Sequence, residues 1–83
     1  MINVGNISAG TTTVQLADTP KLLVCLLSDC WIFAMRNTSL IDRGGINEYS
    51  SEVVGDMTIS SSHVLSFRHS ASGTHICTVY CIY

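Results

Sequence analysis

Charged side chains are scarce in this 83-residue chain, at 12% of the residues, about half of the ~25% usual in soluble domains. Only four of them are cations, and the formal net charge is −2. Those cations are Lys21, Arg36, Arg43 and Arg68. Phosphate contacts need clustered cations, so four scattered ones argue against a nucleic-acid partner. With so few charges and a mean hydropathy of +0.38, we expect some apolar surface to meet another subunit.

The sequence also shows no pattern of an export signal or of a membrane span. Residues 1–6 offer neither the basic segment nor the apolar run of a secretory signal, so we expect no export by that route. The most apolar stretch, Leu22 to Met35, is interrupted by Ser28 and Asp29, and it is shorter than the about 20 apolar residues that cross a bilayer. We therefore expect no membrane partner.

Motifs for catalysis and for metal binding are lacking as well. There is no G-x-S-x-G sequence and no glycine-rich phosphate loop, and the acidic residues are scattered rather than paired. His75, Cys77 and Cys81 are metal-ligand residue types, but in a strand they lie too far apart to hold one ion. The sequence therefore predicts a protein that is not an enzyme and that holds neither a cofactor nor a metal.

The four cysteines, Cys25, Cys30, Cys77 and Cys81, raise the question of a disulfide. In an extended strand, Cys77 and Cys81 lie about 13 Å apart, well beyond the ~7 Å between Cα atoms that a disulfide spans. A bridge from Cys25 or Cys30 to the C-terminal segment stays geometrically open. In the absence of a secretory signal, free and buried thiols are the favoured interpretation.

β-Branched residues are what the chain has in abundance. Val, Ile and Thr fill 23 positions against 11 for Leu and Ala, which favours strands throughout. Apolar and polar residues alternate in four segments, at 11–17, 53–60, 63–69 and 75–83, and turn signals separate them. Six to eight short strands at this spacing predict one all-β domain over residues 1–83, an antiparallel β-sandwich or a small barrel.

The stretch Leu22 to Met35 is ambiguous between one helix and two strands. Its apolar residues fall at helical spacing, and Thr19 with Pro20 would begin a helix well. A helix here would be apolar nearly all round, however, in a domain too small to bury it. We favour two strands joined near Ser28, apolar on both faces, as the middle of a sandwich or a subunit interface requires.

Aromatic and large apolar residues supply the candidate contact positions. We expect an interface to draw on Trp31, Ile32 and Phe33 from the central stretch and on Tyr80 and Tyr83 from the closing strand. One further tyrosine lies in a polar segment and is the candidate for contact with a ligand such as a sugar, since aromatic faces suit pyranose rings. It is Tyr49.

Several short patterns together resemble a known class of proteins. Residues 2–12 read Ile-x-Val-x-x-Ile-Ser-x-Gly-Thr-Thr, a serine-rich turn precedes residues 64–67, and the chain closes on Thr-Val-Tyr-Cys-Ile-Tyr. With the apolar strand pair, these features are similar to small β-sandwich virion proteins of tailed bacteriophages, which often have a glycine in place of Cys81. The four cysteines depart from that family's pattern.

The resemblance implies a non-enzymatic structural role in the virion: capsid decoration, a head fibre, or a tail or baseplate subunit. It implies other capsid or tail proteins as partners, a homo-oligomer such as a trimer, and assembly in the host cytoplasm. It contains no site residue that could be transferred to this chain. Two other functions stay open, a small phage-encoded inhibitor of a host defence protein or of its signalling nucleotide, and a carbohydrate-binding module.

Overall fold

The computed structural model describes residues 1–28, 30–43, 54–70 and 72–83, and this part of the chain forms eight strands and no helix. The strands are β1 (Ile2–Ile7), β2 (Gly10–Gln15), β3 (Leu22–Leu27), β4 (Cys30–Arg36), β5 (Ser39–Arg43), β6 (Val54–Ile59), β7 (Val64–His69) and β8 (His75–Ile82). The all-β class and the number of strands predicted from the sequence are confirmed.

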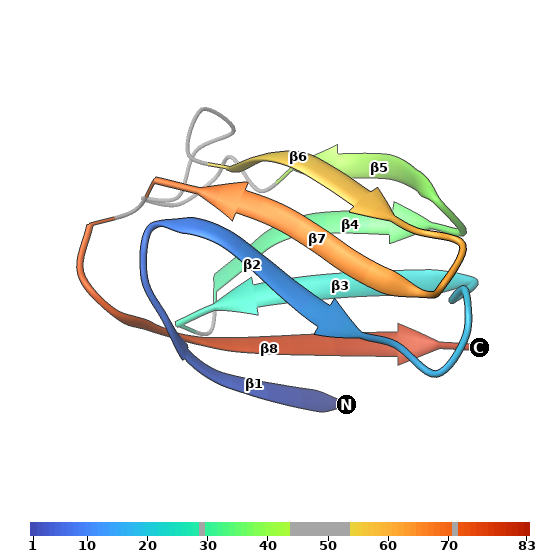
Figure 1. Cartoon of the computed structure of the whole chain (residues 1–83), viewed down its shortest axis with the longest axis horizontal. Helices are drawn as coiled ribbons and strands as arrows, with labels where there is room; N and C mark the ends of the chain where they lie inside the picture. The colour runs from blue at the N-terminus through green and yellow to red at the C-terminus, as the bar shows by residue number, and fades with distance from the viewer. Residues whose placement is uncertain (29, 44–53, 71) are drawn as a thin grey trace.

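The strands form two antiparallel sheets that pack face to face (Figure 1). One sheet has five strands in the order β1-β8-β3-β4-β5, and the other has three in the order β2-β7-β6. The C-terminal strand β8 inserts between β1 and β3, so the last residues of the chain hold its first strand in the sheet. This arrangement is a small β-sandwich.

The chain changes sheets between β1 and β2, and two glycines allow it to do so. The pairing of β1 with β8 shifts register between Asn3 and Gly5, and Gly5 has a φ of 89°. Gly10, the first residue of β2, has a φ of 126°. Both values lie in the region that only glycine adopts without strain, so the bulge and the crossing depend on these two residues.

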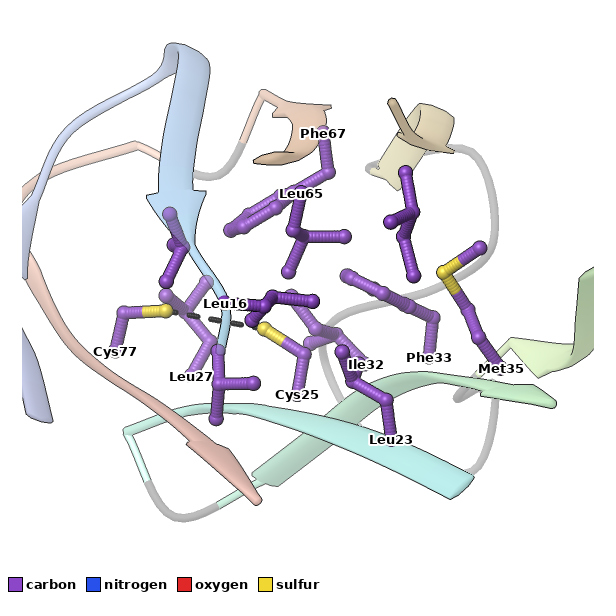
Figure 2. Packing of buried hydrophobic residues seen from close by; sticks show 13 residues of the cluster. Leu16, Leu23, Cys25, Leu27, Ile32, Phe33, Met35, Leu65, Phe67 and Cys77 are labelled. Atoms are coloured by element: carbon purple, nitrogen blue, oxygen red, sulfur yellow. Dashed lines mark hydrogen bonds between the residues drawn. The ribbon is translucent and has the colours of Figure 1, made fainter. Parts of the chain in front are cut away.

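The core lies between the sheets and consists of the inward residues of each alternating strand (Figure 2). The rings of Phe33 from β4 and Phe67 from β7 meet across the two layers with their centroids 5.3 Å apart. Around them pack Val14, Leu16, Leu23, Cys25, Leu27, Ile32, Met35, Ile59, Leu65, Cys77 and Val79. Burial of each large apolar side chain here contributes about 1.5–3 kcal/mol, so these few residues supply most of the fold's stability.

The central stretch forms the strand pair β3 and β4, so the strand interpretation is confirmed and the helical one is wrong. β3 is paired on both sides, with β8 and with β4, which satisfies its backbone through the sheet. Its residues alternate between buried and half-buried, with Leu23, Cys25 and Leu27 on the core side. The helical spacing was misleading because almost every position in the stretch is apolar. In such a run, apolar residues occur at the spacing of a helix and at the spacing of a strand alike.

Candidate functional site

The outer surface of the five-stranded sheet is apolar over its three middle strands, β8, β3 and β4. Cross-strand pairing aligns its side chains in rows: Tyr80 lies beside Val24 and Val24 beside Ala34, while Leu26 lies beside Trp31. We call this surface the apolar face. Its apolar members are Leu22, Val24 and Leu26 of β3, Trp31 and Ala34 of β4, and Ile76, Tyr80 and Ile82 of β8, and the polar Thr78 of β8 lies among them opposite Leu26.

The residues of the apolar face point away from the core. None of them belongs to the core cluster or packs against it, although their sequence neighbours Leu23, Cys25 and Val79 do. The strand period of two explains this division, because each core residue is followed by one on the opposite side of the sheet. Nothing among the described residues of this chain therefore covers Ile76, Tyr80 and Ile82, which are 59%, 46% and 61% exposed.

The side chains of the apolar face differ in exposure. Ile76, Tyr80 and Ile82 of β8 are exposed, whereas Leu22, Val24 and Leu26 on the neighbouring strand are half-buried. Asn3 and Asn6 of β1 border the face on one side. Arg36 and Asp42 border it on the other, where β4 pairs with β5.

The outer surface of the three-stranded sheet has the opposite character. Its exposed positions on β2 are Thr11, Thr13 and Gln15, and they pair with Arg68, Ser66 and Val64 of β7. Thr58 of β6 is exposed beside Ser66 on the same surface. Hydroxyl groups therefore coat this side, as they do in ordinary solvated sheets. The contrast between the two surfaces singles out the apolar face as a candidate contact surface.

The structure places the expected contact residues at different depths. Trp31 and Tyr80 lie on the apolar face, the first half-buried and the second exposed. Ile32 and Phe33 lie in the core with no exposed surface, so a partner cannot reach them in the folded chain. Ile32 turns inward beside Phe33 because the register of β3 and β4 shifts at this point. The candidate ligand contact Tyr49 lies outside the described residues.

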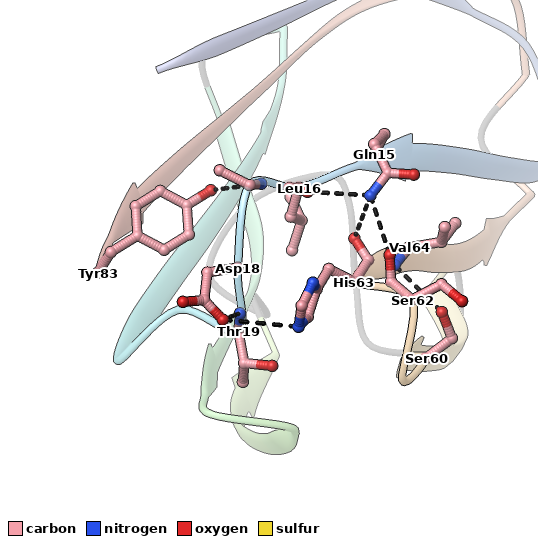
Figure 3. A network of polar contacts seen from close by, with 10 residues as sticks. Gln15, Leu16, Asp18, Thr19, Ser60, Ser62, His63, Val64 and Tyr83 are labelled. Atoms are coloured by element: carbon pink, nitrogen blue, oxygen red, sulfur yellow. Dashed lines mark hydrogen bonds and ion pairs between the residues drawn. The ribbon is translucent and has the colours of Figure 1, made fainter.

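Tyr83 is exposed at the end of β8, and its phenol oxygen accepts a hydrogen bond of 3.3 Å from the backbone amide of Ala17 (Figure 3). Partial burial raises the pKa of Tyr83, and the hydrogen bond from Ala17 opposes that effect. This contact ties the end of the chain to the segment after β2. No local sequence pattern indicates this long-range bond, whereas the alternation over 75–83 puts Ile76, Thr78 and Ile82 on the same face as Tyr80.

The same end of the sandwich carries a polar network centred on Gln15 (Figure 3). Its side-chain amide donates to the carbonyls of Leu16 at 2.9 Å, Ser62 at 3.0 Å and His63 at 3.3 Å. His63 in turn lies 3.5 Å from a carboxylate oxygen of Asp18, a distance that permits an ion pair when the imidazole is protonated. The network joins the β6–β7 turn to the end of β2, and its many partners within the chain favour a structural role.

Cys25 and Cys77 lie side by side in the core, with their sulfur atoms 3.8 Å apart (Figure 2). All four cysteines are free, as predicted, but only Cys25 and Cys77 are buried, whereas Cys30 and Cys81 are half-buried. The hydrogen bond with Cys77, and after it burial, raises the pKa of Cys25 far above the usual range. The same bond lowers the pKa of Cys77 against the effect of burial. Because a charge is costly in this dry core, the two thiols stay neutral.

His69, the last residue of β7, is only 1% exposed, and neither of its ring nitrogens has a hydrogen-bond partner among the described residues. Its ring packs near that of Phe67, with the centroids 6.4 Å apart. Loss of hydration lowers the pKa of His69, with the Ser8 backbone opposing this effect and His75 adding to it. A buried imidazole with no partner is costly, so this position weakens the fold.

His75 occupies an exposed hydrogen-bonded cluster at the other end of β8. Its Nε2 lies 2.8 Å from the carbonyl oxygen of Ser72, and its Nδ1 lies 3.0 Å from the hydroxyl of Ser28. A carbonyl only accepts, so Nε2 carries the proton in the neutral ring and Nδ1 accepts from Ser28. Ser28 has a φ of 50° at the end of β3. The cluster therefore fastens a strained turn to the start of β8.

Three further observations concern ligands and known proteins. Within the described ranges, no group of three or more His, Cys, Asp or Glu residues is placed to hold a metal ion. The described part of the chain also holds no helix that is long and apolar enough to cross a membrane. Comparison with protein-family models, with curated proteins and with solved structures finds no match for this chain.

Proposed function

We propose that this protein is a non-enzymatic structural component of a tailed-bacteriophage virion, in capsid decoration, a head fibre or a tail-associated assembly. It acts by protein–protein contact, and its contact surface is the apolar face. The single observation that carries the assembly role is that face, with Ile76, Tyr80 and Ile82 exposed on one strand. The virion setting rests on the sequence resemblance.

The composition of the apolar face supports assembly. Specific interfaces have an apolar, often aromatic centre and a polar rim. Here Tyr80 and Trp31 lie among aliphatic side chains, and the asparagines of β1 and the charged residues of β4 and β5 lie at the margins. An exposed apolar surface of this kind on a small domain marks an interaction site, and the hydroxyl-coated opposite surface can face solvent in the assembly.

The test is incorporation into particles. Virions of the phage that encodes this sequence are purified and their proteins identified by mass spectrometry, and the wild-type chain is expected among them. An Ile76→Glu variant is expected to fold and yet be absent from particles, because the face would have to bury a carboxylate. The matched control is Thr13→Glu on the hydroxyl-coated surface, which is expected to be incorporated normally.

Absence of the wild-type chain from purified virions contradicts the virion role. Equal incorporation of the Ile76→Glu variant contradicts the assignment of the apolar face. Capture of one host defence protein by the wild-type chain, in place of incorporation, favours the inhibitor function instead.

A further inference from the structure

We infer that Cys25 and Cys77 form a redox-active pair, which a small-molecule disulfide such as oxidised glutathione converts into a disulfide bond between β3 and β8. The bond lies in the core, so its formation is independent of the proposed use of the apolar face. The structure holds the reduced form, in which both thiols are free. Oxidation turns this contact between two strands into a covalent link.

The two sulfur atoms already touch in the reduced chain. They lie 3.8 Å apart, and Figure 2 shows the two side chains directed toward each other from neighbouring strands. In the register of β3 and β8, Cys25 is opposite Val79 and Cys77 is opposite Leu27, so the two cysteines are diagonal neighbours. Diagonal neighbours have Cα atoms roughly 7–8 Å apart, close to the ~7 Å that a disulfide spans. The bond therefore closes by side-chain rotation and a slight approach of the two strands.

The register of the sheet separates the other cysteines. Cys81 is opposite Leu23 and Cys30 is opposite Leu27, at positions of β3 that lie about 13 Å apart. Cys30 and Cys77 flank Leu27 from its two sides, which places them two strand spacings, or roughly 9.6 Å, apart. Both separations exceed the ~7 Å limit, so neither of these bonds fits the folded sheet.

The exchange proceeds in two steps, each of which forms one S–S bond and breaks another. The thiolate of one cysteine attacks a sulfur of oxidised glutathione, and the first glutathione leaves as a thiol. The second cysteine then attacks the mixed disulfide on its neighbour, and the second glutathione leaves. The pair loses two electrons and two protons, and one glutathione disulfide becomes two glutathione thiols.

Burial determines when this exchange takes place. Cys25 and Cys77 have no exposed surface, so glutathione reaches them before the sheet has formed or when β8 separates locally from β3. Folding then brings the second sulfur against the first, which raises its effective concentration and favours closure of the bond. The fold therefore sets how completely the bond forms, and the opening of the strand pair sets how fast.

The bond links positions that are 52 residues apart in the sequence, so it restricts the unfolded chain and stabilises the fold. β8 lies between β1 and β3, and the link therefore fixes the strand that holds β1 in the sheet. A virion component is assembled in a reducing cytoplasm and released with the particle, which gives thiols during assembly and the disulfide afterwards. This last consequence rests on the proposed function, whereas the bond itself does not.

Refolding from urea into glutathione buffers tests the inference, because both thiols are accessible at the start. Trypsin leaves two cysteines in each of the peptides 22–36 and 69–83, so the test uses the variant Cys30→Ser/Cys81→Ser, which keeps one cysteine in each. Both replaced residues are only half-buried, and circular dichroism checks that the variant folds. Mass spectrometry without reduction then identifies the linked peptides.

The refolded variant is expected to yield the two peptides linked, with a mass lower by two hydrogen atoms than that of the reduced pair. At one glutathione ratio, the ratio of bridged to reduced chain is expected to be about 30-fold or more higher after refolding than in urea, because the fold favours the bond as much as the bond favours the fold. The urea midpoint of the bridged chain is expected to exceed that of the reduced chain.

In the wild type, Cys25→Ser and Cys77→Ser are each expected to abolish the link and the rise in urea midpoint. A refolded chain that is bridged no more than the chain kept in urea overturns the inference. So does a bridged chain whose urea midpoint is no higher than that of the reduced chain, or a link that survives Cys25→Ser. None of these outcomes alters the incorporation test, which decides the proposed function separately.

Discussion

His69 gives the sharpest test of what determines the stability of the fold, because it is a buried imidazole whose two nitrogens lack hydrogen-bond partners among the described residues. We predict that His69→Leu stabilises the fold. Leucine has a similar volume, can pack beside Phe67 in the same way, and leaves no polar atom dehydrated. Removal of an unpaired buried polar group is worth about 1–3 kcal/mol. For a domain of this size, each 1 kcal/mol corresponds to roughly 4–8 °C in Tm.

The stabilisation by His69→Leu is expected to grow as the pH falls. Dehydration lowers the pKa of His69 in the folded state, whereas the unfolded chain has an ordinary histidine pKa of about 6.5. Below that pH the unfolded state binds a proton at this histidine, whereas the folded state does not. The wild type therefore loses stability as the pH drops through 6.5, with a slope of up to about 1.4 kcal/mol per pH unit from this one group.

Urea unfolding at pH 7.5 and at pH 5.0, followed by circular dichroism, measures both effects. All other groups are the same in both proteins, so the difference between wild type and variant isolates His69. We expect His69→Leu to be more stable at both pH values and the difference to be larger at pH 5.0. A variant that is less stable than the wild type at pH 7.5, or a difference independent of pH, refutes this account of the site.

Three further outcomes follow from the core and from the polar end of the sandwich. Phe33→Ala removes a fully buried ring that contacts Phe67 across the two sheets. Urea unfolding is therefore expected to show a free energy of unfolding lower by about 3–5 kcal/mol, and a decrease of less than about 1 kcal/mol contradicts this packing. Iodoacetamide is expected to leave Cys25 and Cys77 unmodified in the native protein and to label them in denaturant, as peptide mass spectrometry would show; rapid native labelling argues against a closed core. Gln15→Ala removes three hydrogen bonds, so the free energy of unfolding measured in urea is expected to fall by about 1–2 kcal/mol. An unchanged midpoint of urea unfolding indicates that water replaces the amide.

The alternation of side chains made the strands and their buried sides predictable from sequence. Val14, Leu65 and Phe67 occupy apolar positions of the alternating segments 11–17 and 63–69, and they point inward, because a strand with one solvated face must place its apolar residues on the other. The pairing of strands was not predictable in the same way. The position of β8 between β1 and β3 depends on contacts between the two ends of the chain, and no pattern within one segment of the sequence predicts such contacts.

The functional surface was predicted only in part for the same reason. The sequence indicated that the central stretch is apolar on both faces, but which face meets the core depends on register. The shift of register in β4 sends Ile32 and Phe33 both to the inside and leaves Trp31 on the outside. Similarly, His69 ends a strand whose other inward residues are apolar, and nothing in its neighbours indicates that it would be buried without a partner.

The apolar face is a local departure from the rule that antiparallel sheets alternate between core and solvent residues. β1 and β2 follow the rule, with Asn3 and Thr13 exposed on their outer sides. Among the described residues, the three middle strands of one sheet, β3, β8 and the facing part of β4, depart from it most, and the edge strand β5 adds the exposed Leu40 and Ile41. A generally hydrophobic composition would spread apolar residues over both outer surfaces. Their concentration at the centre of one surface, inside a polar margin, is instead the distribution that a specific contact requires.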